Sequence, residues 1–129
     1  MTATALQAFN DAIRNPGNPD HLMVIKDVPR RIRIYHGATL IADSTSALRV
    51  LEIGKSFYDP VFYLPEADLK TGLVPVDRST HCPIKGDASY VAVDGTEIGW
   101  VYRTPIPMAD RLTAHYAFWP AKVRVVEGE

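Results

Sequence analysis

The spacing of hydrophobic residues changes along the chain from a helical to an extended pattern. Leu6, Phe9 and Ile13 fall at positions i, i+3 and i+7, with alanines between them. This spacing predicts a short amphipathic helix over residues 4–14. The proline- and glycine-rich stretch 15–19 would end that helix, because neither residue continues a helical hydrogen-bond ladder at low cost.

Beyond this point the apolar runs are short and are separated by turn signals, which is typical of β-strands. Glycine marks two tight turns, at residues 36–38 and at Asp94-Gly95, a dipeptide that hairpins favour. The segment at residues 69–76, broken by a glycine and a proline, predicts a strand or an extended edge. We expect a helical extension over residues 1–21 and a single β domain over residues 22–129.

A second helix is expected near the C-terminus. Two prolines precede Met108–Ala117, and proline close to the start is common in helices. With this helix the chain has two short helices and seven or eight short strands. Because the sequence shows no strand–helix–strand alternation, we do not expect a doubly wound parallel sheet. We predict a mainly β fold (small α+β), a compact antiparallel domain.

Composition and charge narrow the class of protein. The 129 residues are 47% hydrophobic and 22% charged, which is ordinary for a globular domain. The net charge of −1 lacks the excess of cations that a general nucleic-acid binder needs. The apolar runs fall far short of the roughly 18 residues of a membrane span, and no signal peptide is visible. We therefore expect a cytoplasmic protein without nucleic-acid or membrane partners.

The richest mixture of chemical groups lies in residues 80–90. This segment contains the only cysteine together with a histidine, a lysine and several hydroxyl groups. A polar group buried without a partner costs about 1–3 kcal/mol, so such a mixture is unsuited to a core strand. The segment is therefore expected to be either a site or an exposed loop. A single cysteine excludes an internal disulfide and a zinc site with several cysteines.

Three residues are candidates for catalysis. Cys82 would act as a nucleophile if a cation favoured its thiolate, and Lys85 is close in sequence. His81 is a candidate for proton transfer, but in an extended segment it points away from Cys82. Glu52 falls on the same strand face as two apolar residues, where a carboxylate needs a partner such as Arg49, Lys85 or His81. All three candidates also have an ordinary structural interpretation.

Six further residues are candidates for ligand binding. Lysine next to glycine suits an anion, because the ammonium supplies charge and glycine lets backbone N–H groups approach. Aromatic rings with polar tips suit a mixed pocket. The candidates are Thr80, Lys85, Gly86, Ser89, Tyr63 and Tyr90. No metal and no cofactor are expected.

Several blocks in order along the chain resemble one family. They are Arg31-Ile32-Arg33-Ile34, Ala42-Asp43-Ser44, Ala47-Leu48-Arg49-Val50-Leu51-Glu52, Pro60-Val61-Phe62-Tyr63-Leu64-Pro65, Thr80-His81-Cys82-Pro83 with Lys85-Gly86, Ala88-Ser89-Tyr90, Trp100 with Tyr102, and Ala117-Phe118-Trp119-Pro120. Together they resemble domain of unknown function family 427, small bacterial and fungal proteins, over about residues 22–127. The resemblance implies a compact, mostly β domain that is similar to the β-tent group.

The family also carries a nucleotidyltransferase-like label. Such transferases usually have a Gly-Ser turn and paired carboxylates that hold magnesium, and this sequence has no Gly-Ser dipeptide and no obvious aspartate pair.

Three alternative functions are compatible with the sequence. The first is a module that binds a small polar or anionic molecule at Thr80–Gly86. The second is an enzyme, a cysteine- or histidine/glutamate-based hydrolase or transferase. The third is an interaction domain. The oligomeric state stays open.

Overall fold

Residues 11–128 are described by a computed structural model. Within them lie eleven strands and two short 3-10 helices. The strands are β1 (Ile13–Asn15), β2 (Asn18–Asp27), β3 (Ile32–His36), β4 (Thr39–Ser44), β5 (Leu48–Ile53), β6 (Val61–Pro65), β7 (Val74–Cys82), β8 (Gly86–Val93), β9 (Thr96–Val101), β10 (His115–Phe118) and β11 (Arg124–Glu127). The helices are η1 (Glu66–Asp68) and η2 (Pro107–Leu112).

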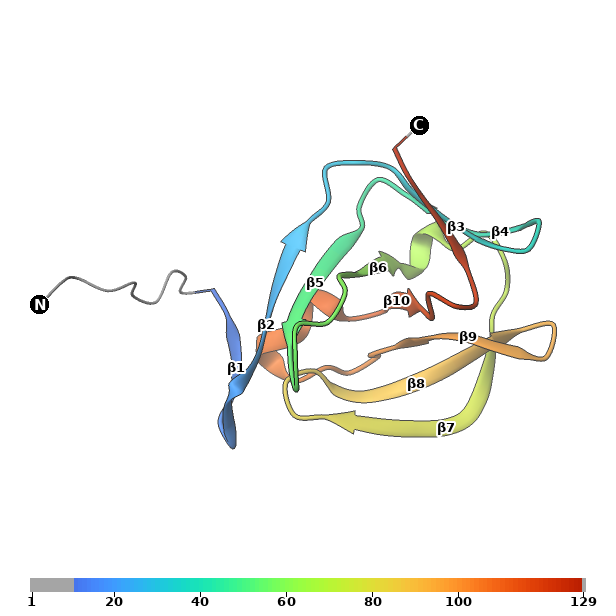
Figure 1. The fold of residues 1–129 in the computed structure, drawn as a ribbon. Helices are drawn as coiled ribbons and strands as arrows, with labels where there is room; N and C mark the ends of the chain where they lie inside the picture. Colours follow the sequence, from blue (N-terminus) through green and yellow to red (C-terminus); the bar gives the residue numbers. More distant parts are fainter. Residues whose placement is uncertain (1–10, 129) are drawn as a thin grey trace, which may run out of the picture.

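The strands form two antiparallel sheets. The larger has eight strands in the order β1-β2-β5-β6-β10-β9-β8-β7, and the smaller has three in the order β11-β3-β4 (Figure 1). Every strand pair within them is antiparallel. The prediction of a mainly β antiparallel domain is confirmed. The expected seven or eight strands are too few, because residues 11–128 hold eleven, three of them in a second sheet. The similarity to the β-tent group stays a prediction.

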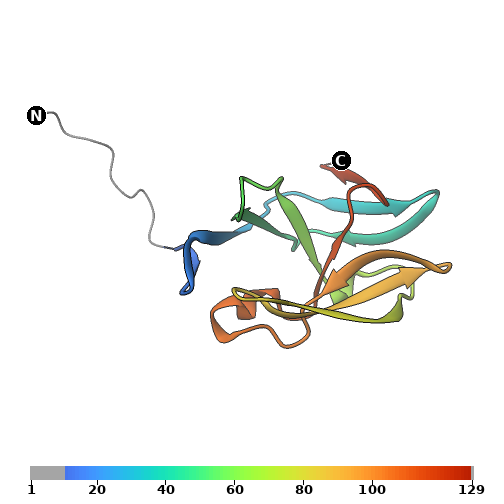
Figure 2. The ribbon, with the colours of Figure 1, turned by 60° about the horizontal axis from the view of Figure 1, so that its bottom comes forward.

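The larger sheet bends at strand β6, which pairs with a different neighbour at each end. Its first part, Val61–Tyr63, pairs with β5, and its last two residues, Leu64 and Pro65, pair with β10. The strands on either side of β6 therefore lie in different layers (Figure 2). The bend brings one face of the sheet together with itself, so β5 comes to lie opposite β8 and β9.

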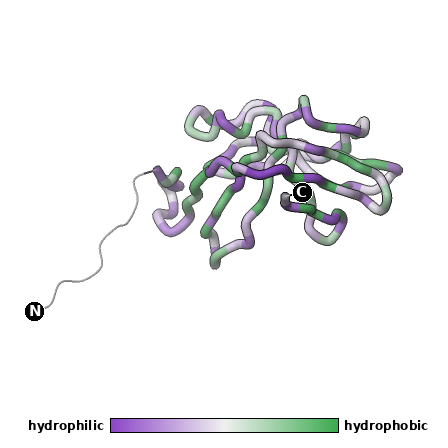
Figure 3. The backbone as a smooth tube through the Cα atoms, turned by 90° about the horizontal axis from the view of Figure 1, so that it is seen from above, coloured by the Kyte–Doolittle hydropathy of each residue, from purple (hydrophilic) through white to green (hydrophobic). Residues whose placement is uncertain are grey.

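Hydrophobic and hydrophilic residues are interspersed along the strands (Figure 3), and successive side chains point to opposite faces of the sheet. The inner face of the bend carries one core cluster, whose larger members are Met23, Leu48, Val50, Tyr63, Ile84, Tyr90, Tyr102 and Leu112. The outer face packs against the three-stranded sheet through a second cluster, which includes Ile32, Ile34, Ile41, Leu64, Val91, Val93, Ile98, Val101, Tyr116 and Phe118. Both faces of the central strands are thus buried, and the larger sheet contributes to two separate hydrophobic cores.

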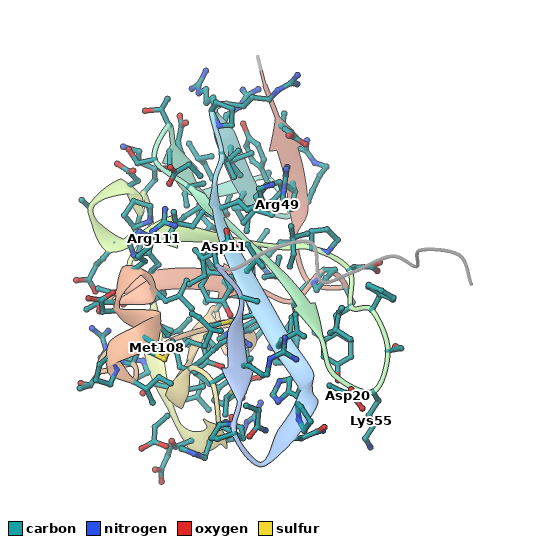
Figure 4. All side chains as sticks on the ribbon, turned by 90° about the vertical axis from the view of Figure 1, so that its left-hand side faces the viewer. Asp11, Asp20, Arg49, Lys55, Met108 and Arg111 are labelled. Atoms are coloured by element: carbon teal, nitrogen blue, oxygen red, sulfur yellow. The ribbon has the colours of Figure 1, made fainter. Side chains whose placement is uncertain are left out.

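The helix η2 links the two layers at one side of the molecule. The Arg111 guanidinium donates a hydrogen bond to the carbonyl oxygen of Ile25 at 3.1 Å and a second one to the Asp27 carboxylate. Figure 4 shows Arg111 and Met108 on this side, beside the edge strand β1 and its neighbour β2. Since η2 follows β9 in the chain, these bonds tie the second half of the sheet to its first half.

The prediction of an N-terminal helix is wrong for the part of it that the structure describes. Ile13–Asn15 is strand β1, and Ile13 pairs with Met23 in β2. Ile13 is buried in the inner core cluster. As part of a strand it reaches that cluster, and its backbone pairs with the backbone of β2. Residues 4–10 of the expected helix lie outside the described residues. The expected domain boundary at residue 21 falls within β2.

The prediction of a second helix is confirmed for its first half and is wrong for its second half. Only Pro107–Leu112 is helical, in 3-10 geometry, and His115–Phe118 is strand β10. Sheet pairing prevails here because β10 fills the position between β6 and β9 and buries Tyr116 and Phe118. Neither helical segment in residues 11–128 has the length and hydrophobicity that a membrane span requires.

The hairpin predictions are confirmed at both glycine turns. Residues 36–38 connect β3 to β4, and Asp94-Gly95 connects β8 to β9 with positive φ at both residues. The segment expected at residues 69–76 becomes a strand only from Val74, and that strand extends to Cys82. The chemically rich segment is therefore a hairpin, with β7 before the turn and β8 after it.

Gly99 provides a test of the packing between β9 and β10. A Cβ at this position would overlap the carbonyl oxygen of Ala117 and the ring of Phe118. We expect Gly99→Ala to lower the free energy of unfolding by about 1–3 kcal/mol, measured by urea denaturation. Gly72→Ala is the matched control, because a Cβ there would meet no atom within 4 Å. Equal effects of the two changes would contradict this packing.

Candidate functional site

A pocket of about 340 Å³ lies inside the bend of the larger sheet. One wall comes from β5, the loop after it and β6, and the other wall comes from the β7–β8 turn, β8, β9 and the residues after β10. The lining residues are Val50, Glu52, Tyr58, Asp59, Val61, Tyr63, Lys85, Tyr90, Trp100, Tyr102, Trp119 and Pro120. The pocket thus depends on the bend, because its two walls are separate in sequence.

A buried ion pair joins the two walls. The ammonium of Lys85 donates a hydrogen bond to Oε1 of Glu52 at 2.5 Å, and the two side chains are 8% and 15% exposed. Glu52 lies on the inward face of β5, two residues after Val50. Lys85 ends the turn between β7 and β8. The pair therefore connects β5 to that turn across the interior of the bend.

The turn holds Lys85 in place through its backbone. The N–H of Ile106 donates to the carbonyl oxygen of Lys85 at 2.9 Å. Gly86 follows with φ of +118°, and a Cβ there would press on the backbone of Pro105 and Ile106. Only glycine takes this conformation without strain and lets the two backbones approach. Gly86 therefore has a conformational role here, and its expected role in ligand binding stays a prediction.

The second oxygen of Glu52 is bonded to His21, a residue that the sequence did not single out. Nε2 of His21 lies 2.8 Å from Oε2 of Glu52, and Nδ1 lies 3.2 Å from the side-chain nitrogen of Asn15. An ionised carboxylate only accepts, so Nε2 carries the proton and Nδ1 accepts from the Asn15 amide. The β1–β2 hairpin therefore supplies a second donor to the buried carboxylate.

The two members of the ion pair stabilise each other's charged forms. Burial by itself would raise the pKa of Glu52, but Lys85 and His21 outweigh it, and the pKa lies below its usual value. Burial would likewise lower the pKa of Lys85, but the Glu52 carboxylate, together with Tyr102 and Cys82, outweighs it and raises that pKa. Both groups are therefore charged at neutral pH.

Aromatic rings form most of the remaining surface. Trp100 and Trp119 lie 4.5 Å apart between ring centroids, Tyr63 meets Trp100 edge to face at 6.3 Å, and Tyr90 stacks on Trp119 at 6.3 Å. The indole N–H of Trp100 donates to the hydroxyl of Tyr63 at 3.1 Å. Burial raises the pKa of Tyr63 and of Tyr102, so both phenols stay neutral.

An outer set of contacts fixes these rings from behind. The guanidinium of Arg78 lies 3.6 Å from the centre of the Tyr90 ring and pairs with Glu97 at 2.9 Å. The indole N–H of Trp119 donates to the same carboxylate at 3.0 Å. Both tryptophan N–H groups are therefore bonded to protein partners, and the indoles offer the pocket carbon surface.

The structure brings some of the candidate residues together. Four of them line the pocket, namely Glu52, Lys85, Tyr63 and Tyr90. The hydroxyl of Thr80 lies 2.6 Å from that of Tyr90, so Thr80 positions a lining residue without lining the pocket itself. Ser89 lies on the other face of β8, where it lines a separate hollow with Arg78.

His81 does not join the other two candidates for catalysis. It lies on the outward face of β7 and meets Asp87 at 2.8 Å, with the two side chains 66% and 76% exposed. The alternation of a strand separates it from Cys82, as the sequence predicts. Of the three partners expected for Glu52, the structure shows Lys85. His21 is an additional partner.

Cys82 lies beside the ion pair and does not line the pocket. Its sulfur is 4.0 Å from the ammonium of Lys85. Cys82, His21 and Glu52 each offer one ligand atom, and these atoms lie within 4.8 Å of one another. A divalent cation bound there would compete with the ammonium of Lys85 for the Glu52 carboxylate. The lysine thus supplies the positive charge that this set of donors requires.

Sequence reasoning missed several residues of the site, one behind the pocket and the others in its lining. His21 gave no signal, because a single histidine in an extended run is common. The aromatic residues were recognised as a group, but the sequence could not show which of Trp100, Tyr102 and Trp119 line a pocket. Asp59 follows the exposed loop residue Tyr58 and resembled an ordinary turn residue.

The fold and the site together define a class of protein. It is a mainly β antiparallel domain whose larger sheet bends around an aromatic pocket with a buried lysine–glutamate pair. The chain belongs to the family described as Domain of unknown function (DUF427), whose family model matches residues 24–129. The resemblance seen in the sequence is therefore confirmed. No curated protein matches the chain.

The ion pair predicts a large effect of removing one partner. We expect Glu52→Gln to lower the free energy of unfolding by about 3–5 kcal/mol, because it leaves the Lys85 charge buried and unpaired. The double change Glu52→Gln with Lys85→Met should recover most of that loss, since it removes both charges. Urea denaturation of the natural protein and of these two variants measures this. As a control, Asp87→Asn removes an exposed partner and should change stability by less than about 0.5 kcal/mol.

The same pair predicts a pH dependence. The pKa of Glu52 is lowered in the folded state, so its contribution is complete above the ordinary value of 4.5 and is lost as the pH falls through the folded pKa. The pKa of Lys85 is raised, so its contribution is complete below the ordinary value of 10.5 and is lost at higher pH. Urea denaturation from about pH 3 to about pH 8 should show a smaller acid loss in the double variant than in the natural protein. Equal losses would contradict the assignment.

Proposed function

We propose that this domain binds a small polar molecule in the pocket inside the bent sheet. The observation that carries the proposal is the placement of a charged, buried lysine–glutamate pair at the wall of a cavity whose other walls are aromatic. Binding pockets are typically apolar with a few placed polar groups, and their volumes start at about 300 Å³. The cavity, at about 340 Å³, suits a small molecule.

The surroundings of the pair support binding more than a purely structural role. A buried ion pair contributes little net stability compared with apolar residues of similar volume. A stable core at this position would be easier to build with leucine and methionine. The charges are instead held next to an opening, with Glu52 at 15% exposure. That arrangement gives a ligand a fixed polar contact.

Both tryptophans of the chain line the pocket, which provides a direct measurement. A library of small polar metabolites, both cationic and anionic, is titrated while the tryptophan emission is recorded. We expect at least one compound to change the emission in a saturable manner and to raise the melting temperature. The response should be weaker in Val61→Phe, which narrows the pocket, and unchanged in Val125→Phe, an exposed strand position. A library without any such compound would contradict the proposal.

A second candidate function is an enzyme that uses Cys82 as a nucleophile. The observation that favours it is the position of Cys82, whose sulfur lies 4.0 Å from the Lys85 ammonium and near His21 and Glu52. A nearby cation is what activates a thiol. However, both nitrogens of His21 already have partners, so the imidazole is not directed at the sulfur. A hydrolase or transferase of this type would need His21 to turn.

Alkylation with iodoacetamide tests the nucleophile. If Cys82 were catalytic, it would react in the folded protein faster than in the urea-unfolded protein, and Lys85→Met would abolish the difference. Because Cys82 is half-buried and carries no directed base, we expect slower reaction in the folded state. Faster reaction in the folded state would favour the enzyme over the binding module.

The proposal extends to location and partners. The chain carries a net charge of −1 and one cysteine, which suits a reducing cytoplasm and a small-molecule ligand in place of nucleic acid. Fractionation of cells that express the tagged protein at its natural level tests the location.

A further inference from the structure

The charged groups that line the pocket favour a positively charged ligand. Among the described residues of the lining, Glu52 and Asp59 carry carboxylates and Lys85 carries the one cationic group. Lys85 and Glu52 neutralise each other at 2.5 Å. Asp59 is exposed at the pocket and forms no ion pair within residues 11–128, so it leaves the cavity with a net negative charge. An anion entering the pocket would meet an ammonium that is already paired.

The aromatic surface favours the same sign. The face of a tryptophan ring is the strongest aromatic partner of a cation. Trp100 and Trp119 bind their N–H groups to Tyr63 and Glu97, so neither indole offers a donor to an anion. The rings of this pocket already hold cations in two places, because Arg78 lies 3.6 Å from the centre of Tyr90 and Lys85 lies 6.0 Å from that of Tyr102.

The hydrogen-bond acceptors of the pocket restrict the cation further. Both oxygens of Glu52 have donors, and the hydroxyl groups of Tyr63 and Tyr90 are bonded to Trp100 and Thr80. Asp59 is then the lining carboxylate that is left to accept, whereas a buried primary ammonium carries three N–H groups that need acceptors. An alkylated ammonium needs few acceptors or none, and it keeps its positive charge.

We propose that the pocket takes a small organic cation with an alkylated ammonium group, held on the ring faces of Trp100 and Trp119 beside the Asp59 carboxylate. This inference rests on the proposed function, because it names the chemical class of the ligand for the same pocket. The ammonium lies against the indoles, and the remainder of the molecule reaches the Glu52–Lys85 pair, which bridges the two walls and offers a polar contact.

Choline and its uncharged carbon analogue, 3,3-dimethylbutan-1-ol, form a matched pair of probes. They have the same shape and hydroxyl group and differ in charge. Titrations at low ionic strength follow the emission of the two tryptophans, with isothermal calorimetry as a second readout. We expect choline to bind with saturation and at least about tenfold more tightly than the alcohol, which is the range of a cation–aromatic contact in a partly dry site.

Two substitutions locate the charge. Asp59→Asn removes the carboxylate at the pocket and should weaken choline binding by about three- to tenfold while leaving the affinity for the alcohol unchanged. Asp94→Asn removes a carboxylate at the tip of the β8–β9 hairpin and should leave both affinities unchanged. Asparagine is well tolerated at the positive φ of residue 94, so this control also keeps the fold.

The outcomes separate the two proposals. If the alcohol binds as tightly as choline, or Asp94→Asn weakens choline as much as Asp59→Asn does, cation recognition is wrong. If acetate or another anion binds and choline does not, the ligand class is wrong while the binding function stands. If neither choline nor any compound of the metabolite library changes the tryptophan emission or the melting temperature, the binding function itself is wrong.

Discussion

The contact between Glu52 and Lys85 is the interaction on which the remainder of the site depends. Each charge alone would be costly at this depth, and each is stabilised by the other at 2.5 Å. The two residues are 33 positions apart in sequence and come from opposite walls of the bent sheet. The pair therefore requires the bend at β6. Because His21 adds a third group from β2, the interaction joins three separate parts of the sheet.

The pocket exists because one sheet has two different faces to cover. The outer face is covered by β3, β4 and β11, which bury it in an apolar cluster. The inner face closes on itself and carries long aromatic side chains, and between them a cavity persists next to the ion pair. Arg78 and Glu97 fix the rings of Tyr90 and Trp119 from behind, so the cavity walls do not depend on a ligand for their position.

The two candidate functions involve neighbouring residues, and the directions in which these side chains point distinguish one function from the other. Lys85 and Glu52 face the cavity, whereas Cys82 lies behind them and His81 lies on the outside of the molecule. Covalent chemistry would need the thiol at the cavity surface with a base directed at it. Binding needs only fixed charges and rings, which the pocket provides. The negative balance of its lining then favours an organic cation over the anion that a lysine next to a glycine first indicates.

The sequence by itself determined the mainly antiparallel β architecture, both glycine hairpins and the need of the Glu52 carboxylate for a partner. These depend on local rules, namely two-residue alternation and the backbone freedom of glycine. It failed at residues 13–15 and 115–118, where pairing with a neighbouring strand overrode a helical spacing. It could not identify His21, Asp59 or the choice of tryptophans. Alternation assigns a side chain to a face of its strand, but only the bend of the sheet decides which faces meet.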